Sequence, residues 1–330
     1  MVMTVGIGNN PTILDSQTAA LLANVAASGK PPLYEQGVDQ ARQGLTAFSL
    51  AMAPPSRPVA RVEDGSIPGG GGSLSVRIYW PIAKATRDKP ATLLYFHGGG
   101  FALGDLDTHD AICRHLCDDG HAVVISVDYR RPPEHKFPAA AEDCYTALCW
   151  AAEETDILGG DPHRLIVAGD SAGGNLAAVM ALMARDRHGP KIALQILIYP
   201  VTDMDPAYDT PSRRDFGGGD YFLSINDMAW LAELYAVTKA DLANPYMSPR
   251  RAASLAGLPP AIILTAGCDP LCDEGKDYAD RLAAAGVPVT YKCYEHTIHG
   301  FISFAGGIDA GKDALAFLSK RVRSDRDKSR

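Results

Sequence analysis

The chain has 330 residues, of which 46% are hydrophobic and 21% charged, and its 39 acidic residues outnumber 31 basic ones to give a net charge of −8. This composition excludes a disordered chain, a collagen, a coiled coil and a disulfide mini-protein, and it argues against nucleic acid or a basic membrane-binding surface. The length fits two domains, or one α/β domain with insertions.

Two helices are predicted in the N-terminal segment. Apolar residues at three- to four-residue spacing begin near residue 12 and stop at Gly29, before a Pro-Pro pair. A second helical pattern covers roughly 36–52, and the proline-rich loop 54–58 closes the segment.

From about residue 59, predicted strands alternate with predicted helices. Short apolar runs indicate strands over 73–80, 91–96, 121–128, 164–168, 193–199, 261–266 and 289–294. Helical patterns between most of them cover 107–118, 139–154, 175–187, 273–285 and 309–322. Continuous apolar strands separated by helices predict an α/β fold, with a mostly parallel central sheet flanked by helices on both faces. The run 73–80 alternates instead, which is typical of an antiparallel edge strand.

Residues 205–243 interrupt this alternation, because they contain a predicted helix over 224–236 and no strand. Together with residues 1–53, this segment is predicted to form a helical cap over one edge of the sheet. The catalytic core would then be a single α/β domain made of 54–204 and 244–330. The glycine runs 69–72 and 217–219 are interpreted as flexible loops rather than phosphate sites, since neither joins a strand to a helix N-terminus.

Cysteine usage and targeting signals indicate the compartment. Seven cysteines with no C-x-x-C pair favour reduced, mostly structural thiols, and a zinc site is the alternative, although no ligand spacing repeats. The sequence MVMTVGIGNNPTILD lacks the basic and apolar regions of a signal peptide. No apolar stretch approaches the roughly eighteen residues of a membrane span. A cytoplasmic protein is therefore expected.

The pentapeptide Gly169-Asp170-Ser171-Ala172-Gly173 fits the G-x-S-x-G pattern. Alone this pattern is only weak evidence for a nucleophilic serine, and a glycine-rich helix start is the alternative. Here a predicted strand runs directly into it and a predicted helix runs directly out. A serine on such a turn is held in a strained, exposed conformation suited to a nucleophile.

A second glycine motif, His97-Gly98-Gly99-Gly100, follows the predicted strand 91–96. Its backbone can approach a substrate carbonyl with N–H groups pointing inward, as an oxyanion hole requires. A glycine hinge is the alternative. A dinucleotide or P-loop site is excluded, because neither G-x-G-x-x-G nor a glycine-lysine pair is present.

When a serine on such a strand-to-helix turn is a nucleophile, an acid and then a histidine should follow it along the chain. Asp269 comes just after the predicted strand 261–266, and it is favoured over Asp273 and Glu274, which fall in the first turn of the next helix. His299 is favoured over His296 as the base. The two histidines lack a nearby acidic third ligand, so a metal site is not expected.

These motifs together resemble the bacterial hormone-sensitive-lipase family of esterases, in its GDSAG branch. The matching segments, in order and spacing, are HGGGF at 97–101, GDSAGGNLAA at 169–178, DPLCDEG at 269–275 and HGF at 299–301. Two positions depart from the family pattern: Arg131-Pro132 stand where Leu-Ala is usual, and Cys272 where Arg is frequent.

The resemblance implies an α/β-hydrolase fold and a serine esterase that needs no metal or cofactor. Ser171 would be the nucleophile, His299 the general base and acid, and Asp269 the group that orients the imidazole. Backbone N–H groups would form the oxyanion hole, and they belong to Gly99, Gly100 and Ala172. Family members often form homodimers.

The expected activity is hydrolysis of short- to medium-chain carboxylic esters. An amide hydrolase with the same triad is the alternative, and a non-catalytic receptor on this fold is disfavoured because all three triad positions are filled. Clustered aromatic residues in the inserted segment, Tyr221, Phe222 and Trp230, are predicted to line the substrate pocket, although they could also pack only between cap and core.

Overall fold

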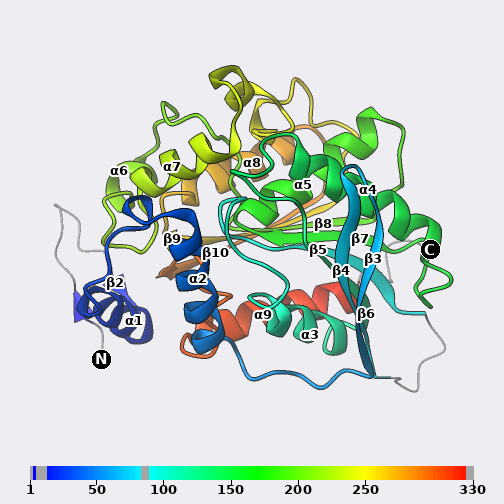
Figure 1. Ribbon diagram of the computed structural model, residues 1–330, viewed down its shortest axis with the longest axis horizontal. Helices are drawn as coiled ribbons and strands as arrows, with labels where there is room; N and C mark the ends of the chain where they lie inside the picture. Colours follow the sequence, from blue (N-terminus) through cyan, green and yellow to red (C-terminus); the bar gives the residue numbers. More distant parts are fainter. Residues whose placement is uncertain (1–2, 5–12, 83–88, 325–330) are drawn as a thin grey trace.

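The computed structural model describes residues 3–4, 13–82 and 89–324, and its centre is an eight-stranded sheet (Figure 1). The strand order is β10-β9-β8-β7-β5-β6-β4-β3, and all pairs from β10 to β6 are parallel. The strand bounds are Arg61–Gly69 (β3), Gly72–Trp80 (β4), Ala91–Phe96 (β5), Ala122–Val127 (β6), Leu165–Asp170 (β7), Leu194–Ile198 (β8), Ala261–Cys268 (β9) and Val289–Ile298 (β10). Two further short strands, Met3–Thr4 (β1) and Ile13–Leu14 (β2), pair with each other.

Helices cover both faces of the sheet, because the buried strands are apolar on both sides. One core cluster joins the sheet to α4 (Ala139–Glu154), α5 (Ala172–Asp186) and α8 (Cys272–Ala284). The opposite cluster joins it to α3 (Asp110–Asp118) and α9 (Asp309–Ser324). Figure 1 shows these two layers above and below the sheet.

The remaining helices gather at one side of the molecule, on the left of Figure 1. They come from two separate stretches of sequence. Their bounds are Ser16–Ala27 (α1), Val38–Met52 (α2), Pro211–Phe216 (α6) and Ile225–Tyr235 (α7), and short 3₁₀ turns cover Leu33–Glu35 (η1), Lys239–Ala243 (η2) and Pro249–Arg251 (η3).

All seven predicted strands form, but the edge of the sheet was predicted wrongly. An eighth strand, β3, lies outside β4 and pairs with it antiparallel along its whole length. The glycine run 69–72 is the turn of this hairpin, with Gly69 paired to Gly72, and not a flexible loop. In β3 only Ile67 is buried, so the apolar pattern that identifies a strand is absent.

The N-terminal helix begins four residues later than predicted. Asp15 caps α1 by accepting hydrogen bonds from the backbone N–H groups of Gln17 and Thr18, so the helix starts at Ser16. The predicted start at residue 12 lies outside the described residues. The short helix α6 was not predicted, although Thr210 caps it and Pro211 occupies its first position.

Candidate active site

Ser171 occupies a strained turn between β7 and α5. Its φ of 55° and ψ of −117° lie in a region that residues other than glycine rarely adopt. A Cβ atom on Gly173 would lie 1.8 Å from the Phe96 carbonyl oxygen, and one on Gly169 would lie 2.3 Å from the Gly173 carbonyl oxygen. Both glycines of the pentapeptide are therefore required by the close approach of backbone segments.

Three side chains from separate strand ends form a hydrogen-bonded series. His299 Nε2 lies 2.9 Å from Ser171 Oγ, and His299 Nδ1 lies 2.7 Å from Asp269 Oδ2. A carboxylate only accepts, so Nδ1 carries the proton and Nε2 accepts from the serine hydroxyl. Asp269 is fully buried, and its other oxygen accepts from the Leu271 N–H at 2.8 Å. The histidine is thereby held in the tautomer that a general base needs.

The rival residues considered for these roles lie elsewhere. His296 is exposed on β10, and the imidazole at hydrogen-bond distance from Ser171 Oγ is that of His299. Asp273 Oδ2 accepts from the backbone N–H of Ser212, and Glu274 is paired with Arg213, so both acids bind α6. The structure thus brings together Ser171, His299 and Asp269.

The glycine motif after β5 forms a tight loop beside the serine. Gly99 and Gly100 have φ of 111° and 59°, and both line the cavity that contains Ser171. A Cβ on Gly100 would lie 2.3 Å from a methyl of Leu231 on α7. Ala172 is the first residue of α5, so its N–H has no acceptor within the helix. Backbone donors are thus available on both sides of the serine.

Asp170, the variable residue of the pentapeptide, joins this loop to the serine turn, a role that the sequence did not reveal. Its Oδ1 accepts from the Gly98 N–H at 3.0 Å and the Tyr95 hydroxyl at 2.9 Å, and it lies 3.1 Å from His109 Nε2. Burial alone would raise the pKa of Asp170, but His109 and Tyr95 lower it by more, so the group is ionised at neutral pH. The signal was an acid directly before the serine.

A cavity of about 890 Å³ opens beside Ser171 and His299. Its mainly apolar wall combines residues of α1, α2 and α7 with Phe222 and Phe304. Phe48 of α2 completes an aromatic cluster with these two rings, whose centroids lie 5.1 to 5.8 Å apart. Phe48 and Phe304 were missed because neither belongs to the inserted segment whose clustered aromatic residues drew the prediction.

Of the three aromatic residues predicted for the pocket, Phe222 lines the cavity. Tyr221 is buried and packs edge-on against Phe216, with ring centroids 5.0 Å apart. Trp230 packs against a small cluster that includes Ala41 and Leu231. Among the described residues, one of the three predicted aromatic side chains, Phe222, therefore lies at the cavity surface.

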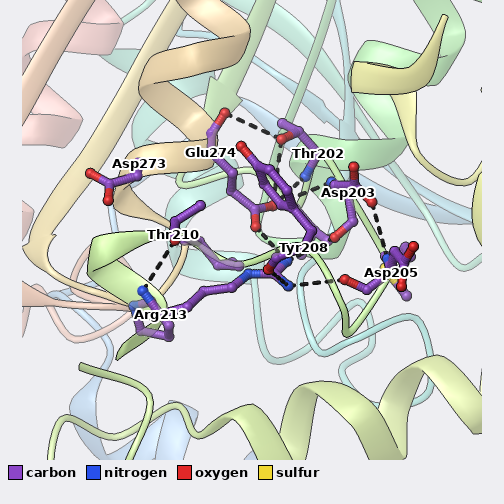
Figure 2. A network of polar contacts seen from close by, with 12 residues as sticks. Thr202, Asp203, Asp205, Tyr208, Thr210, Arg213, Asp273 and Glu274 are labelled. Carbon is purple, nitrogen blue, oxygen red and sulfur yellow. Dashed lines mark hydrogen bonds and ion pairs between the residues drawn. The ribbon is translucent and has the colours of Figure 1, made fainter. Parts of the chain in front are cut away.

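A buried ion pair ties α6 to the first turn of α8, the helix that follows the Asp269 loop (Figure 2). Arg213 Nη2 donates to Glu274 Oε2 at 2.7 Å, and both side chains are at most 5% exposed. Burial raises the pKa of Glu274, although the Arg213 guanidinium opposes this shift. The guanidinium also donates to three backbone carbonyls, those of Asp203, Asp205 and Tyr208.

No helix in the described part of the chain combines the length and apolarity that a bilayer crossing requires. Among the same residues, no group of three or more His, Cys, Asp or Glu side chains is arranged to hold a metal ion.

Comparison with known proteins decides the family. A family model for the alpha/beta hydrolase fold matches residues 93–303. Esterase LipI of Mycobacterium tuberculosis is 44% identical over 282 residues, which are 85% of this chain and 86% of that protein. The chain belongs to the α/β hydrolase fold family. The predicted fold and the resemblance to hormone-sensitive-lipase family esterases are thus confirmed.

Further relatives of this α/β hydrolase agree over nearly its whole length. An ethyl acetate hydrolase of Pseudomonas putida is 35% identical and covers 94% of this chain and 98% of its own. The solved structure of a hyperthermophilic esterase from the archaeon Pyrobaculum calidifontis has a TM-score of 0.89 and 41% identity, and covers 94% of this chain and 98% of that one.

Proposed function

We propose that this α/β hydrolase is a serine carboxylesterase that cleaves short- to medium-chain esters through an acyl-enzyme intermediate. The observation that carries the proposal is the hydrogen-bonded series Ser171–His299–Asp269 at the wall of an apolar cavity. Relatives named as esterases, carboxylic ester hydrolases and an ethyl acetate hydrolase support the substrate class.

In the first half of the reaction, His299 Nε2 takes the Ser171 hydroxyl proton as Oγ attacks the ester carbonyl carbon. The imidazolium that forms lies against the Asp269 carboxylate, which stabilises its charge. The carbonyl oxygen becomes an oxyanion, for which we assign the N–H groups of Gly99, Gly100 and Ala172 as donors. His299 then returns the proton to the departing alcohol.

In the second half, a water molecule replaces the alcohol. His299 removes a proton from this water as it attacks the acyl carbon, and Ser171 leaves with that proton when the acid is released. The triad is then restored, and every proton has moved through one nitrogen atom. This chemistry requires no cofactor or metal ion.

The segments 1–53 and 205–243 are proposed to form a cap over the cavity, with 54–204 and 244–330 as the catalytic core. Supporting this division, α1 and α2 from the first segment and Phe222 and α7 from the second line the cavity, while Ser171 and His299 come from the ends of strands. Phe222 is the proposed substrate contact. A substrate-binding role for Tyr221 and Trp230 remains a prediction. In this proposal their side chains pack behind the cavity wall that Phe222 lines.

A cytoplasmic location and a homodimer also remain predictions. The seven cysteines, which all lie in the described part of the chain, form no disulfide there, which fits a reducing compartment. The homodimer rests on the family resemblance alone.

The test is hydrolysis of p-nitrophenyl acetate, butyrate and hexanoate by the wild type and the Ser171→Ala variant. We expect ready turnover by the wild type and the loss of at least about 10⁴-fold in kcat on removal of the nucleophile. Ser66→Ala, on the exposed β3 hairpin, is the matched control and should keep full activity. Equal rates for Ser171→Ala and wild type would overturn the assignment. A parallel assay with p-nitroacetanilide measures amide cleavage by the same triad.

A further inference from the structure

Two cysteines outside the cavity meet behind the acid and the histidine. Cys272 is the first residue of α8, and its backbone N–H donates to the Asp269 carbonyl at 3.0 Å. Cys293 lies on β10, the strand that leads to His299. Both side chains are half-buried, so small reagents can reach them from solvent.

The sheet register brings the two thiols together. Cys293 pairs with Thr265 of β9, and the Tyr291 hydroxyl lies 2.8 Å from Thr265 Oγ1. Residues two apart on a strand share a face, so Tyr291 and Cys293 lie on the same side of the sheet as Thr265. This is the side that α8 covers, since a Cβ on Gly275 would lie 2.7 Å from the Thr265 methyl.

Cys272 lies three residues before Gly275, and therefore on the same face of α8. Its thiol lies near enough to that of Cys293 for each to shift the pKa of the other, and the Thr265 hydroxyl acts on the pKa of both. The helix and the strand that carry the two thiols, α8 and β10, pack directly against each other.

The two thiols of this pair have different pKa values. The hydrogen bond from Cys272, helped by the Thr265 and Tyr291 hydroxyls, lowers the pKa of Cys293 to about 6 against the opposing effect of burial. The same bond, together with burial, raises the pKa of Cys272 well above its ordinary value. At neutral pH, Cys293 is thus the thiolate and Cys272 the donor. Burial raises the pKa of Cys149 on α4, so this half-buried thiol lacks such activation.

We propose that Cys272 and Cys293 form a dithiol site that hydroperoxides oxidise reversibly to a disulfide, with Cys293 as the first thiol to react. The Cys293 thiolate attacks one oxygen of hydrogen peroxide, the O–O bond breaks, and hydroxide leaves, which gives a sulfenic acid at Cys293. Cys272 then attacks the sulfenic sulfur, the S–O bond breaks, and water leaves with the thiol proton. Two thiols and one peroxide give one disulfide and two waters.

The position of this site separates it from ester chemistry. Neither thiol is among the described residues that line the cavity, so an oxidant and an ester reach different parts of the surface. The new bond would join the start of α8, directly after the Asp269 loop, to the strand that precedes His299. It would cross-link the two segments that carry the acid and the base.

The experiment treats the fully reduced, full-length protein with one equivalent of hydrogen peroxide at pH 7. Free thiols are then blocked with N-ethylmaleimide, and the digest is mapped by mass spectrometry. We expect two of the seven thiols to disappear, one peptide pair linking Cys272 to Cys293, and full reversal by dithiothreitol. Cys149→Ser is the matched control, and it should form the same linked pair.

Two variants test the order of events. Cys272→Ala should stop at a Cys293 sulfenic acid that dimedone traps, whereas Cys293→Ser should leave Cys272 unoxidised. Iodoacetamide should label Cys293 of the wild type with half-maximal rate near pH 6, and removal of the Cys272 donor should shift this midpoint upward by at least one pH unit. Seven thiols remaining after peroxide, a disulfide between other cysteines or chains, or an unchanged labelling midpoint would each overturn the proposal.

Discussion

Replacement of Arg213 by methionine should destabilise the protein in a way that depends on pH. The variant keeps the aliphatic stem but leaves Glu274 fully buried without its cation. A buried charge that loses its partner typically costs about 3–5 kcal/mol, unless the group takes up a proton instead.

Protonation of Glu274 sets an upper limit on this cost. An unfolded glutamate has a pKa of about 4.3, so keeping the carboxyl neutral at pH 7 costs at most about 3.7 kcal/mol, at about 1.36 kcal/mol per pH unit. At pH 5 the limit is about 1 kcal/mol. The folded pKa of Glu274 is already raised, and loss of Arg213 raises it further. The neutral Glu274 carboxyl therefore contributes stability to the folded state at pH values below the pKa of the unfolded chain. This contribution is lost as the pH rises from that value toward the pKa of the folded protein.

Urea unfolding of the wild type and Arg213→Met at pH 5 and pH 7 measures this difference. We expect the deficit of the variant to grow by about 2 kcal/mol between the two pH values. Adding Glu274→Gln to Arg213→Met should remove most of the pH dependence, because the buried carboxyl that had lost its cation is then gone. A deficit that is the same at both pH values would refute the reasoning, since it would come from lost packing and carbonyl hydrogen bonds alone.

Three further substitutions probe the site. Gly100→Ala places a Cβ against Leu231 at a φ of 59°, so kcat should fall about 10²–10³-fold, and Leu231→Ala in the same chain should restore part of it. Asp170→Asn removes the charge opposite His109 and weakens the hold on the glycine loop, so kcat should fall about 10-fold with little change in KM; an equal rate would contradict this role. Phe48→Ala opens the aromatic end of the cavity, so the ratio of kcat/KM for p-nitrophenyl octanoate over acetate should rise about 10-fold, and an unchanged ratio would place the acyl chain elsewhere.

The sequence located the serine, acid and histidine because each follows a predicted strand. In a parallel sheet the carboxyl ends of such strands meet at one edge, so a motif after each strand predicts proximity. Periodicity alone could not choose between His296 and His299. Only Thr297 and Ile298 stand between them, and which of the two histidines reaches the site is set by the fold of the chain at the end of β10.

Contacts made by single, widely spaced side chains could not be predicted in this way. No motif surrounds His109 in the sequence, yet this residue is 4% exposed and its ring lies 3.1 Å from Asp170. Arg213 and Glu274 are separated by 61 residues, and nothing in either segment signals the other. β3 was missed for a different reason: pairing with β4 holds it in place, while its own side chains remain mostly exposed.

The cavity wall and the triad are supplied by different parts of the chain. Substitutions that alter the wall can therefore be made apart from substitutions that alter the triad. Residues such as Leu21, Leu45 and Met228 contribute to the wall from helices that supply no triad member, whereas the turn at Ser171 is constrained by backbone collisions. A randomised library confined to α1, α2 and α7, with Leu231 kept because it packs against Gly100, should therefore vary substrate scope while leaving the triad intact. In this chain, changes of substrate scope and changes of the reaction machinery can thus be made in separate stretches of sequence.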